Sequence, residues 1–367
     1  MKKLLLEDCC EILDSMRIPI TASERKSGSY PYYGANGIQD YVADYIFDDE
    51  LVLLAEDGGN FGSKTKPIAY RVSGKCWVNN HAHVLKPKKD FNVDYLCYSL
   101  MFYNTDGLVN GATRQKLTQA TMRQMLIPQR AYQEQCDIVA QMNKVNLIIK
   151  TRQNQLQKLD ELVKARFVEL FGDPISNPNG WKTEKAEMYI DLCSGFPFDS
   201  SQYTESGVNI CGGLIIMPQR IEWNDCKHWC STEGYEEYTL KKNDIVIALD
   251  RPWISEGFKI AMVDTEHLPA LLIQRTVRIR AIDINQFYLM YCFLLGGFDN
   301  HCNVTGSLVP HISAKDIRSF PIMLPPMGLQ EQFAAFVEQV DKSKVAVQKS
   351  LDEAQLLFDS LMQQYFG

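Results

Sequence analysis

The segment LPPMGLQEQF, residues 324–333, stands in front of a long amphipathic run, and so does the similar segment IPQRAYQEQC, residues 127–136. In each run the apolar residues recur at alternating steps of four and three, the spacing of the a and d positions of a heptad repeat. Each run ends on Phe-Gly, and glycine favours a helix end. The pattern predicts two long helices with narrow apolar stripes, and it leaves open whether they pair within one chain or between two. The stripe positions are Ile138, Met142, Val145, Ile149, Arg152, Leu156, Leu159, Val163, Arg166 and Leu170 in the first run, and Phe333, Val337, Val340, Lys344, Val347, Leu351, Ala354, Phe358, Leu361 and Tyr365 in the second.

The sequence in front of each long helix is a globular segment of short strands and turns that ends with one short apolar helix. A glycine-containing loop and a proline segment then lead into the long helix in both halves. Between the halves, FGDPISNPNGW (171–181) marks a helix stop and a linker. The sequence therefore predicts a mixed α/β fold with an internal repeat. The predicted domains are a globular domain over residues 1–130, a helix over 131–172, a second globular domain over 173–327 and a second helix over 328–367.

The composition is that of a folded protein, with 46% hydrophobic and 23% charged residues in 367. No apolar stretch reaches the length of about 18 residues that a membrane span needs, and acidic residues interrupt the basic N-terminus, so neither a span nor a signal peptide is expected. Eleven cysteines at scattered spacings indicate reduced thiols and a cytoplasmic protein. The net charge is −7, yet residues 60–130 carry 11 basic and 3 acidic residues. This cluster is compatible with an ordinary solvated surface or with a basic face inside an acidic protein.

The motifs of several catalytic and metal-binding classes are missing or incomplete. A base methyltransferase needs a glycine-rich cofactor loop and an Asn/Asp-Pro-Pro-aromatic motif, and neither stands in the sequence. GGNFGSKT (58–65) is not a phosphate loop because Ser63 separates the second glycine from the lysine, so a tight turn is expected. His81 and His83 form an HxH pair, and CKHWC (226–230) is a weak zinc pattern, but neither has companions at diagnostic spacing. We therefore expect no catalytic residues, no metal and no bound cofactor in this chain.

Binding is the chemistry that the remaining residues favour. In LLIQRTVRIRAI (271–282), alternation places Gln274, Thr276, Arg278 and Arg280 on one face of a predicted strand. Arginine and glutamine suit bidentate contacts with guanine and adenine edges, and lysines suit phosphates. A structural role is the competing interpretation for each residue. The candidate DNA-binding residues are Lys64, Lys66, Arg71, Asn79, Asn80, His81, Arg114, Lys116, Arg251, Gln274, Arg275, Arg278 and Lys315.

Taken together, these features resemble the specificity subunits of type I restriction–modification systems, over essentially the full chain. The resemblance rests on the two QEQ helix entrances with FGDP between them, on EDGGNFG and VNNHAHVLKP in the first half, and on DIVIALDRP and LLIQRTVRI in the second. The first entrance departs slightly from the family pattern because IPQRAYQEQ lacks the double proline. The entrance residues, which are candidates for contacts of the spacer helices and of partner subunits, are Gln133, Glu134, Gln135, Gln330, Glu331 and Gln332.

The resemblance implies two α/β target-recognition domains, each reading one half of a split, asymmetric site in double-stranded DNA. Two antiparallel coiled-coil helices would join these domains in a pseudo-twofold relation, the single-chain equivalent of a dimer matched to half-sites. The subunit would be non-catalytic. It would dock a pair of adenine-N6 methyltransferase subunits and, where present, restriction/translocase subunits. S-adenosylmethionine and ATP would be bound by those partners.

Two other functions are compatible with the residues alone. A self-contained DNA methyltransferase or nuclease would bind its cofactor as an isolated chain. A structural coiled-coil homodimer would dimerise through the long helices and would have no affinity for duplex DNA, even with partner subunits present.

Overall fold

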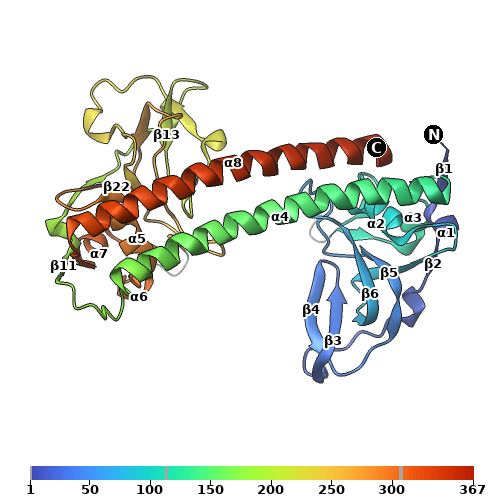
Figure 1. Cartoon of the computed structure of the whole chain (residues 1–367). Coiled ribbons are helices and arrows are strands. Elements are labelled where there is room, and N and C mark those ends of the chain that lie inside the picture. The colour runs from blue at the N-terminus through green and yellow to red at the C-terminus, as the bar shows by residue number, and fades with distance from the viewer. Residues whose placement is uncertain (1, 112–114, 306–308) are drawn as a thin grey trace. The chain divides into compact units, whose positions relative to one another are not determined.

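The computed structural model describes residues 2–111, 115–305 and 309–367, and Figure 1 shows its elements. The chain forms two compact units. Unit 1 comprises Met1–Asn154 and Gln348–Gly367, and unit 2 comprises Gln155–Val347. Each unit contains one globular part and a segment of both long helices, α4 (Tyr132–Phe171) and α8 (Met327–Phe366). The two units thus divide each long helix, whereas the predicted domains separate the helices from the globular parts.

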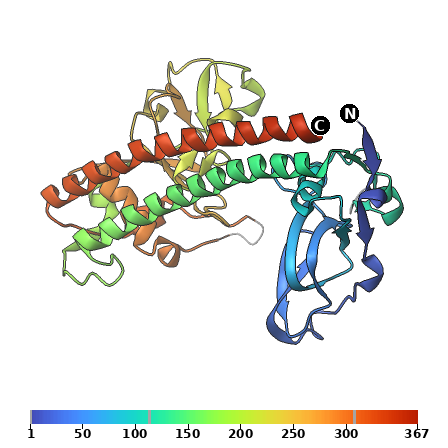
Figure 2. The same cartoon turned by 45° about the vertical axis from the view of Figure 1, so that its right-hand side comes forward.

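The globular part of unit 1 is built on a six-stranded sheet in the order β2-β7-β5-β6-β3-β4. Its central strand β5 is buried along its second half because the sheet is covered on both faces there. Helix α2 (Val93–Met101) lies between this sheet and α4, as Figures 1 and 2 show. Tyr98 of α2 fixes that packing, since its hydroxyl donates to Asn143 at 2.7 Å and accepts from Asn146 at 2.7 Å. The strands of the sheet are β2 (Cys10–Ile12), β3 (Ser27–Gly34), β4 (Gly37–Val42), β5 (Phe47–Ala55), β6 (Ala69–Val78) and β7 (Ala82–Pro87).

Short elements complete unit 1 around the start of α4. Strands β1 and β10 pair antiparallel, and so do β8 and β9. These elements are β1 (Lys3–Leu5), α1 (Leu6–Cys9), β8 (Val109–Asn110), β9 (Lys116–Leu117), α3 (Gln119–Arg123) and β10 (Leu126–Pro128).

The globular part of unit 2 contains a four-stranded antiparallel sheet, β12-β22-β17-β20, and a three-stranded sheet, β16-β13-β21. Three further antiparallel pairs, β11 with β23, β14 with β15 and β18 with β19, surround them. The strands are β11 (Thr183–Lys185), β12 (Ile190–Ser194), β13 (Val208–Cys211), β14 (Ile216–Met217), β15 (Arg220–Ile221), β16 (Lys227–Trp229), β17 (Ile245–Ala248), β18 (Trp253–Ile254), β19 (Gly257–Phe258), β20 (Ile260–Met262), β21 (Ala270–Leu272), β22 (Thr276–Ala281) and β23 (Pro321–Met323). The helices are α5 (Gln286–Leu295), α6 (Phe298–His301) and α7 (Ala314–Ser319).

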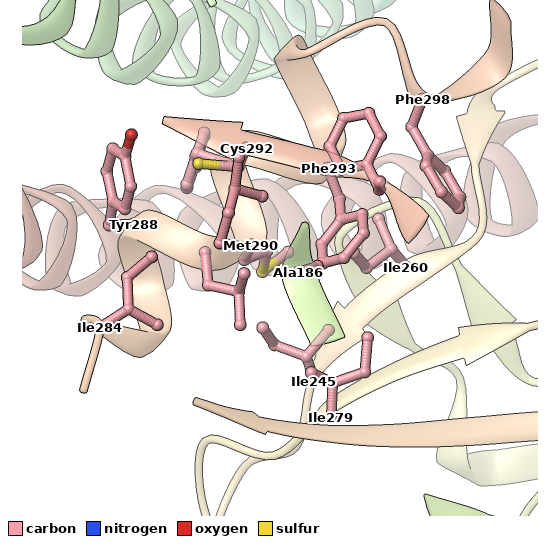
Figure 3. Close-up of a cluster of buried hydrophobic side chains, with 14 of the residues drawn as sticks. Ala186, Ile245, Ile260, Ile279, Ile284, Tyr288, Met290, Cys292, Phe293 and Phe298 are labelled. Atoms are coloured by element: carbon pink, nitrogen blue, oxygen red, sulfur yellow. The ribbon is translucent and has the colours of Figure 1, made fainter. Parts of the chain in front are cut away.

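The core of unit 2 lies between α5 and the four-stranded sheet. Figure 3 shows Met290 and Phe293 of α5 near Ile245 and Ile279 of the sheet. The ring of Tyr288 stacks on Phe167 of α4 with centroids 5.5 Å apart, so the same core holds the long helix. Burying one side chain of this size stabilises the fold by about 1.5–3 kcal/mol. The apolar sequence of α5 therefore has partners on two sides, which explains why it lacks a polar face.

The predicted stripes of the long helices are the buried faces of α4 and α8. Every stripe position is buried or half-buried, including the two arginines and the lysine. In unit 1, Arg152 Nε donates to Ser350 Oγ at 3.0 Å and Tyr365 Oη donates to Gln141 Oε1 at 2.9 Å. Partner numbers therefore fall along α8 as they rise along α4, so the segments run antiparallel. In unit 2, Lys344 pairs with Asp160 at 2.6 Å. The predicted α/β fold with two antiparallel long helices is confirmed.

The segment 271–282 differs from its prediction, which treated it as one alternating strand. The chain ends β21 at Leu272, turns, and begins β22 at Thr276, and the two strands belong to different sheets. Arg275 at the turn has a φ of 64°, a left-handed conformation that breaks an extended strand. The alternation holds only within β22, where Val277 and Ile279 face the core.

Candidate nucleic-acid interface

In both units an aspartate follows the central strand of the main sheet and meets a basic side chain from the neighbouring turn. In unit 1, Asp57 follows β5, and its Oδ1 lies 2.6 Å from Nδ1 of His81. In unit 2, Asp250 follows β17, and its Oδ2 lies 2.6 Å from a guanidinium nitrogen of Arg275. The two pairs occupy equivalent positions, since each aspartate also forms a β-bridge with the loop that precedes α3 or α7, to Lys116 and His311 respectively.

The edge of unit 1 continues inward as a buried network of charged groups. Asp14, Glu56 and His83 have ligand atoms within 4.8 Å of one another, a spacing that could hold a metal ion. However, His83 Nδ1 lies 2.6 Å from Asp14 Oδ2, and Nε2 lies 2.9 Å from the carbonyl oxygen of Leu117. Both ring nitrogens of His83 are therefore engaged in hydrogen bonds with oxygen atoms of the protein. The arrangement is a buried hydrogen-bond network centred on His83.

The charges in this network lower two carboxyl pKa values. Burial alone would raise the pKa of Asp14, but the hydrogen bond and charge of His83, the Val84 N–H and Arg17 hold it below its ordinary value. Burial acts on Glu56 in the same way, and hydrogen bonds from Arg17 at 2.6 Å and Lys116 at 3.0 Å hold its pKa low. Lys116 therefore lies at the surface, and its ammonium group pairs with the Glu56 carboxylate, which also pairs with Arg17.

Several predicted DNA-binding residues belong to the interior instead. The Asn79 side chain is buried, donates to Gln39 at 3.0 Å and accepts from the His81 N–H at 2.8 Å, so it shapes the β6–β7 turn. Arg278 is only 4% exposed, and its guanidinium donates to Asp191 at 2.6 Å across β12 and β22. The alternation could not distinguish this interior arginine from a ligand-binding one, because both fit the polar face of a strand.

The other predicted residues lie at the surface in different places. Arg71 on β6 is exposed and paired with Glu50 and Asp94. Lys64 and Lys66 are exposed in the loop between β5 and β6, where Lys64 lines a cleft of about 710 Å³ within unit 1. Arg114 lies outside the described residues. The remaining exposed candidates are Asn80, Gln274 and Arg251 in turns and Lys315 on α7.

The six entrance residues separate into two kinds. Gln135 and Gln330 are 0% and 3% exposed, and their side chains hydrogen-bond within their own units. Their amides are therefore not available to a partner subunit. The side chains of Gln133, Glu134, Glu331 and Gln332 are exposed, and a docking role for these four stays a prediction.

Sequence reasoning did not single out Asp57 and Asp250 or the turn around Leu214. A sequence signal for the two aspartates exists. Nearly the same number of residues separates the members of three pairs, which are Asp57 and Asp250, His81 and Arg275, and Lys116 and His311. The entrance glutamines Gln135 and Gln330 show the same separation. Aligning Gln135 with Gln330, rather than QEQ with QEQ, would have revealed the shared edge.

The comparisons with known proteins agree on one family. Residues 1–160 and 230–354 match the family model described as the type I restriction modification DNA specificity domain. A Haemophilus influenzae protein assigned provisionally as a type I restriction enzyme specificity subunit is 40% identical over 134 residues, which are 36% of this chain and 34% of that relative's length. The MjaVIII specificity subunit of Methanocaldococcus jannaschii is 23% identical over 91% of this chain and 84% of its own length. The fold is similar to the crystal structure of a type I restriction–modification S subunit from M. genitalium, with a TM-score of 0.61 at 12% identity, covering 100% of this chain and 96% of that one.

Proposed function

The chain belongs to the type I restriction modification DNA specificity family, and from this premise we propose that it is the sequence-specificity subunit of a type I restriction–modification complex. Each unit would bind one half of a bipartite, asymmetric site in double-stranded DNA. DNA-binding proteins read base edges with some side chains and contact phosphates with others.

The repeated strand edge is the observation that carries the proposal. The two units present an aspartate-anchored basic group at equivalent positions, His81 in unit 1 and Arg275 in unit 2. The carboxylate partner orients the basic group, and exposed arginine is suited to guanine edges and phosphates. Because the surrounding turns differ in sequence, the two edges would read different half-sites.

Docking of partner subunits is supported by an apolar groove on the long helices of unit 2. The groove has a volume of about 510 Å³ and is lined by Leu162, Ala165, Arg166, Glu169 and Phe336. Leu162 is 48% exposed, although it lies on a paired helix. Exposed apolar surface of this kind marks protein interfaces. We propose that methyltransferase subunits dock on the long helices, and that a restriction subunit joins where one is present.

The proposed division of labour leaves the chemistry to those partners. The chain itself would be non-catalytic and would bind neither S-adenosylmethionine nor ATP, which the methyltransferase and restriction subunits would hold. It would act in the cytoplasm, where the DNA is. In the parts of the chain that the structure describes, no helix is long and apolar enough to cross a membrane.

The proposal is tested by sequencing the methylome of a host strain with and without this chain, with its methyltransferase partner expressed in both. N6-methyladenine at one split, asymmetric motif should disappear when the chain is absent. Restoring the chain should restore the motif. An unchanged methylome with confirmed partner expression would contradict the specificity role and favour a structural coiled-coil protein.

A further inference from the structure

Leu214 is the most exposed large hydrophobic residue in the described parts of the chain, with an exposed fraction of 92%. It lies in the turn between β13 and β14, which is closed by hydrogen bonds from the Ile215 and Ile216 N–H groups to the Gly212 carbonyl, at 3.1 and 3.4 Å. The turn places an apolar side chain in water at its tip. A single exposed apolar side chain is common on protein surfaces, so the surroundings of Leu214 decide what it can do.

The turn is held rigidly against the strand edge described above. Lys259 Nζ donates to the Gly213 carbonyl from below. A Cβ on Gly212 would lie 2.9 Å from Ile273 Cδ1, so the Gly212 backbone lies close to the side chain of Ile273 in the β21–β22 turn. A Cβ on Gly213 would lie 3.6 Å from Ala248 Cβ at the end of β17. The same Gly213 Cβ would lie 3.9 Å from the Arg275 carbonyl oxygen, so the turn that carries Leu214 adjoins the turn that carries Arg275.

Cations outnumber carboxylates around the turn. Burial and the charge of Arg251 lower the pKa of Lys259, with Asp250 opposing them, which puts both neighbours within electrostatic reach. Arg275 is paired with Asp250, but its side chain is 70% exposed. On the adjoining hairpin, Arg220 pairs with Glu222 and Glu256, and these three leave one net negative charge. An apolar side chain next to exposed arginines is complementary to a nucleic-acid duplex, which has charged phosphates on the outside and stacked bases inside.

We propose that Leu214 is an apolar wedge that inserts between adjacent base pairs of duplex DNA, with Arg251 and Arg275 on the flanking phosphates. Leucine is one of the side chains that proteins insert between base steps, and the energy of unstacking is recovered from added contacts with the deformed duplex. Arginines that neutralise phosphates supply the salt-dependent part of that contact. The wedge would make unit 2 sensitive to how easily a base step opens, without a hydrogen bond to a base. This inference rests on the proposed DNA-binding function.

The test uses the full chain assembled with its methyltransferase subunits and duplexes that carry the methylated motif, with 2-aminopurine placed at successive positions. The wild-type complex should raise 2-aminopurine fluorescence at one base step, because unstacking relieves quenching. Leu214→Ala should abolish the rise and weaken binding roughly tenfold, whereas Leu214→Met should retain both. Met188→Ala is the matched control, since Met188 is 66% exposed in the same unit and lies in a different turn.

Three results would overturn the wedge while leaving DNA binding intact. The first is tight binding with no fluorescence rise at any position. The second is a loss of binding affinity when deoxyuridine replaces thymine, if Leu214→Ala no longer shows that loss. This result would assign Leu214 to a contact with the thymine methyl group. The third is failure of Leu214→Ala to assemble with the methyltransferase subunits, which would make Leu214 a protein contact. A wild-type complex that binds no duplex would instead contradict the proposed function.

Discussion

The side-chain oxygen of Gln135 lies 2.9 Å from the backbone nitrogen of Asn92 and accepts its hydrogen bond. Gln330 accepts from the backbone of Asn285 at the same distance, 2.9 Å, in unit 2. Asn92 and Asn285 are the N-caps of α2 and α5, so each glutamine ties the start of a long helix to the start of a short one. Each also donates to a carbonyl five residues before it, at 3.1 and 2.8 Å. The two helix entrances therefore make the same joint, although Gln135 is the last residue of the first QEQ and Gln330 is the first residue of the second.

Replacing Gln135 by alanine should destabilise unit 1 by about 1–3 kcal/mol, because the partly buried Asn92 N–H and the carbonyl of Asp90 lose their buried partner. The measurement is the urea midpoint of the purified chain. Gln133→Ala is the control, and since Gln133 is exposed we expect a change within about 0.5 kcal/mol. Equal effects of the two substitutions would contradict the assigned joint.

The network around His83 predicts a specific acid sensitivity. The pKa values of Asp14 and Glu56 are lowered from 3.8 and 4.5, so their contribution to stability is present above those values and is lost as the pH falls through the lower, folded-state values. Asp14→Asn removes the carboxylate that hydrogen-bonds with the buried His83 ring and with the Val84 N–H, and it should cost about 3 kcal/mol at pH 7.

The comparison is between wild type and Asp14→Asn in urea titrations from pH 7 down to pH 3. The gap between the two midpoints should shrink as the pH falls below about 4, because Asp14 of wild type then takes up a proton in the unfolded chain before it does so in the folded one. A gap that stays constant over this range would show that Asp14 contributes through packing alone.

Neutralising Arg275 should weaken DNA binding by the assembled complex. Arg275→Gln removes one exposed cation at the strand edge, so the slope of log affinity against log salt should fall by about one. Lys242→Gln is the control, because Lys242 is exposed in the same unit but lies at the other end of β17. Salt titrations by fluorescence anisotropy measure both variants, and an unchanged slope for Arg275→Gln would exclude a phosphate contact.

A carboxylate in the groove of unit 2 should prevent partner docking. Leu162→Asp places a carboxylate in the groove, and this charge would lose its hydration when a partner docks there. We therefore expect association with the methyltransferase subunits to weaken by about 100-fold. Size-exclusion chromatography of the mixed subunits measures this, with Met188→Asp as the control, because Met188 is also exposed in unit 2 but lies away from the long helices. Normal assembly of Leu162→Asp would place the docking surface elsewhere on the long helices.

The helical framework could be predicted because its determinants are local. A heptad stripe, a proline-bearing entrance and a terminal Gly172 each act within a few residues, and Gly172 ends α4 with a φ of 80° and a hydrogen bond from its N–H to Val168. The candidate interface was predictable only in part. Residue type selects Arg278 and Arg275 equally, and alternation places only Arg278 on the polar face of the expected strand. In the structure, pairing with β12 buries Arg278, whereas the turn leaves Arg275 exposed.

The two long helices, the internal repeat and the α/β class could be predicted, because periodicity and turn chemistry follow from the order of neighbouring residues. The fold was needed to show which polar groups form joints, which form ion pairs and which face solvent. Asp14 meets His83 across 69 positions of sequence, and Lys259 supports Gly213 across 46. Such contacts depend on sheet order and loop closure, so no local sequence pattern predicts them. For the same reason, the fold was needed to show that Gln135 is buried and that Leu214 is exposed.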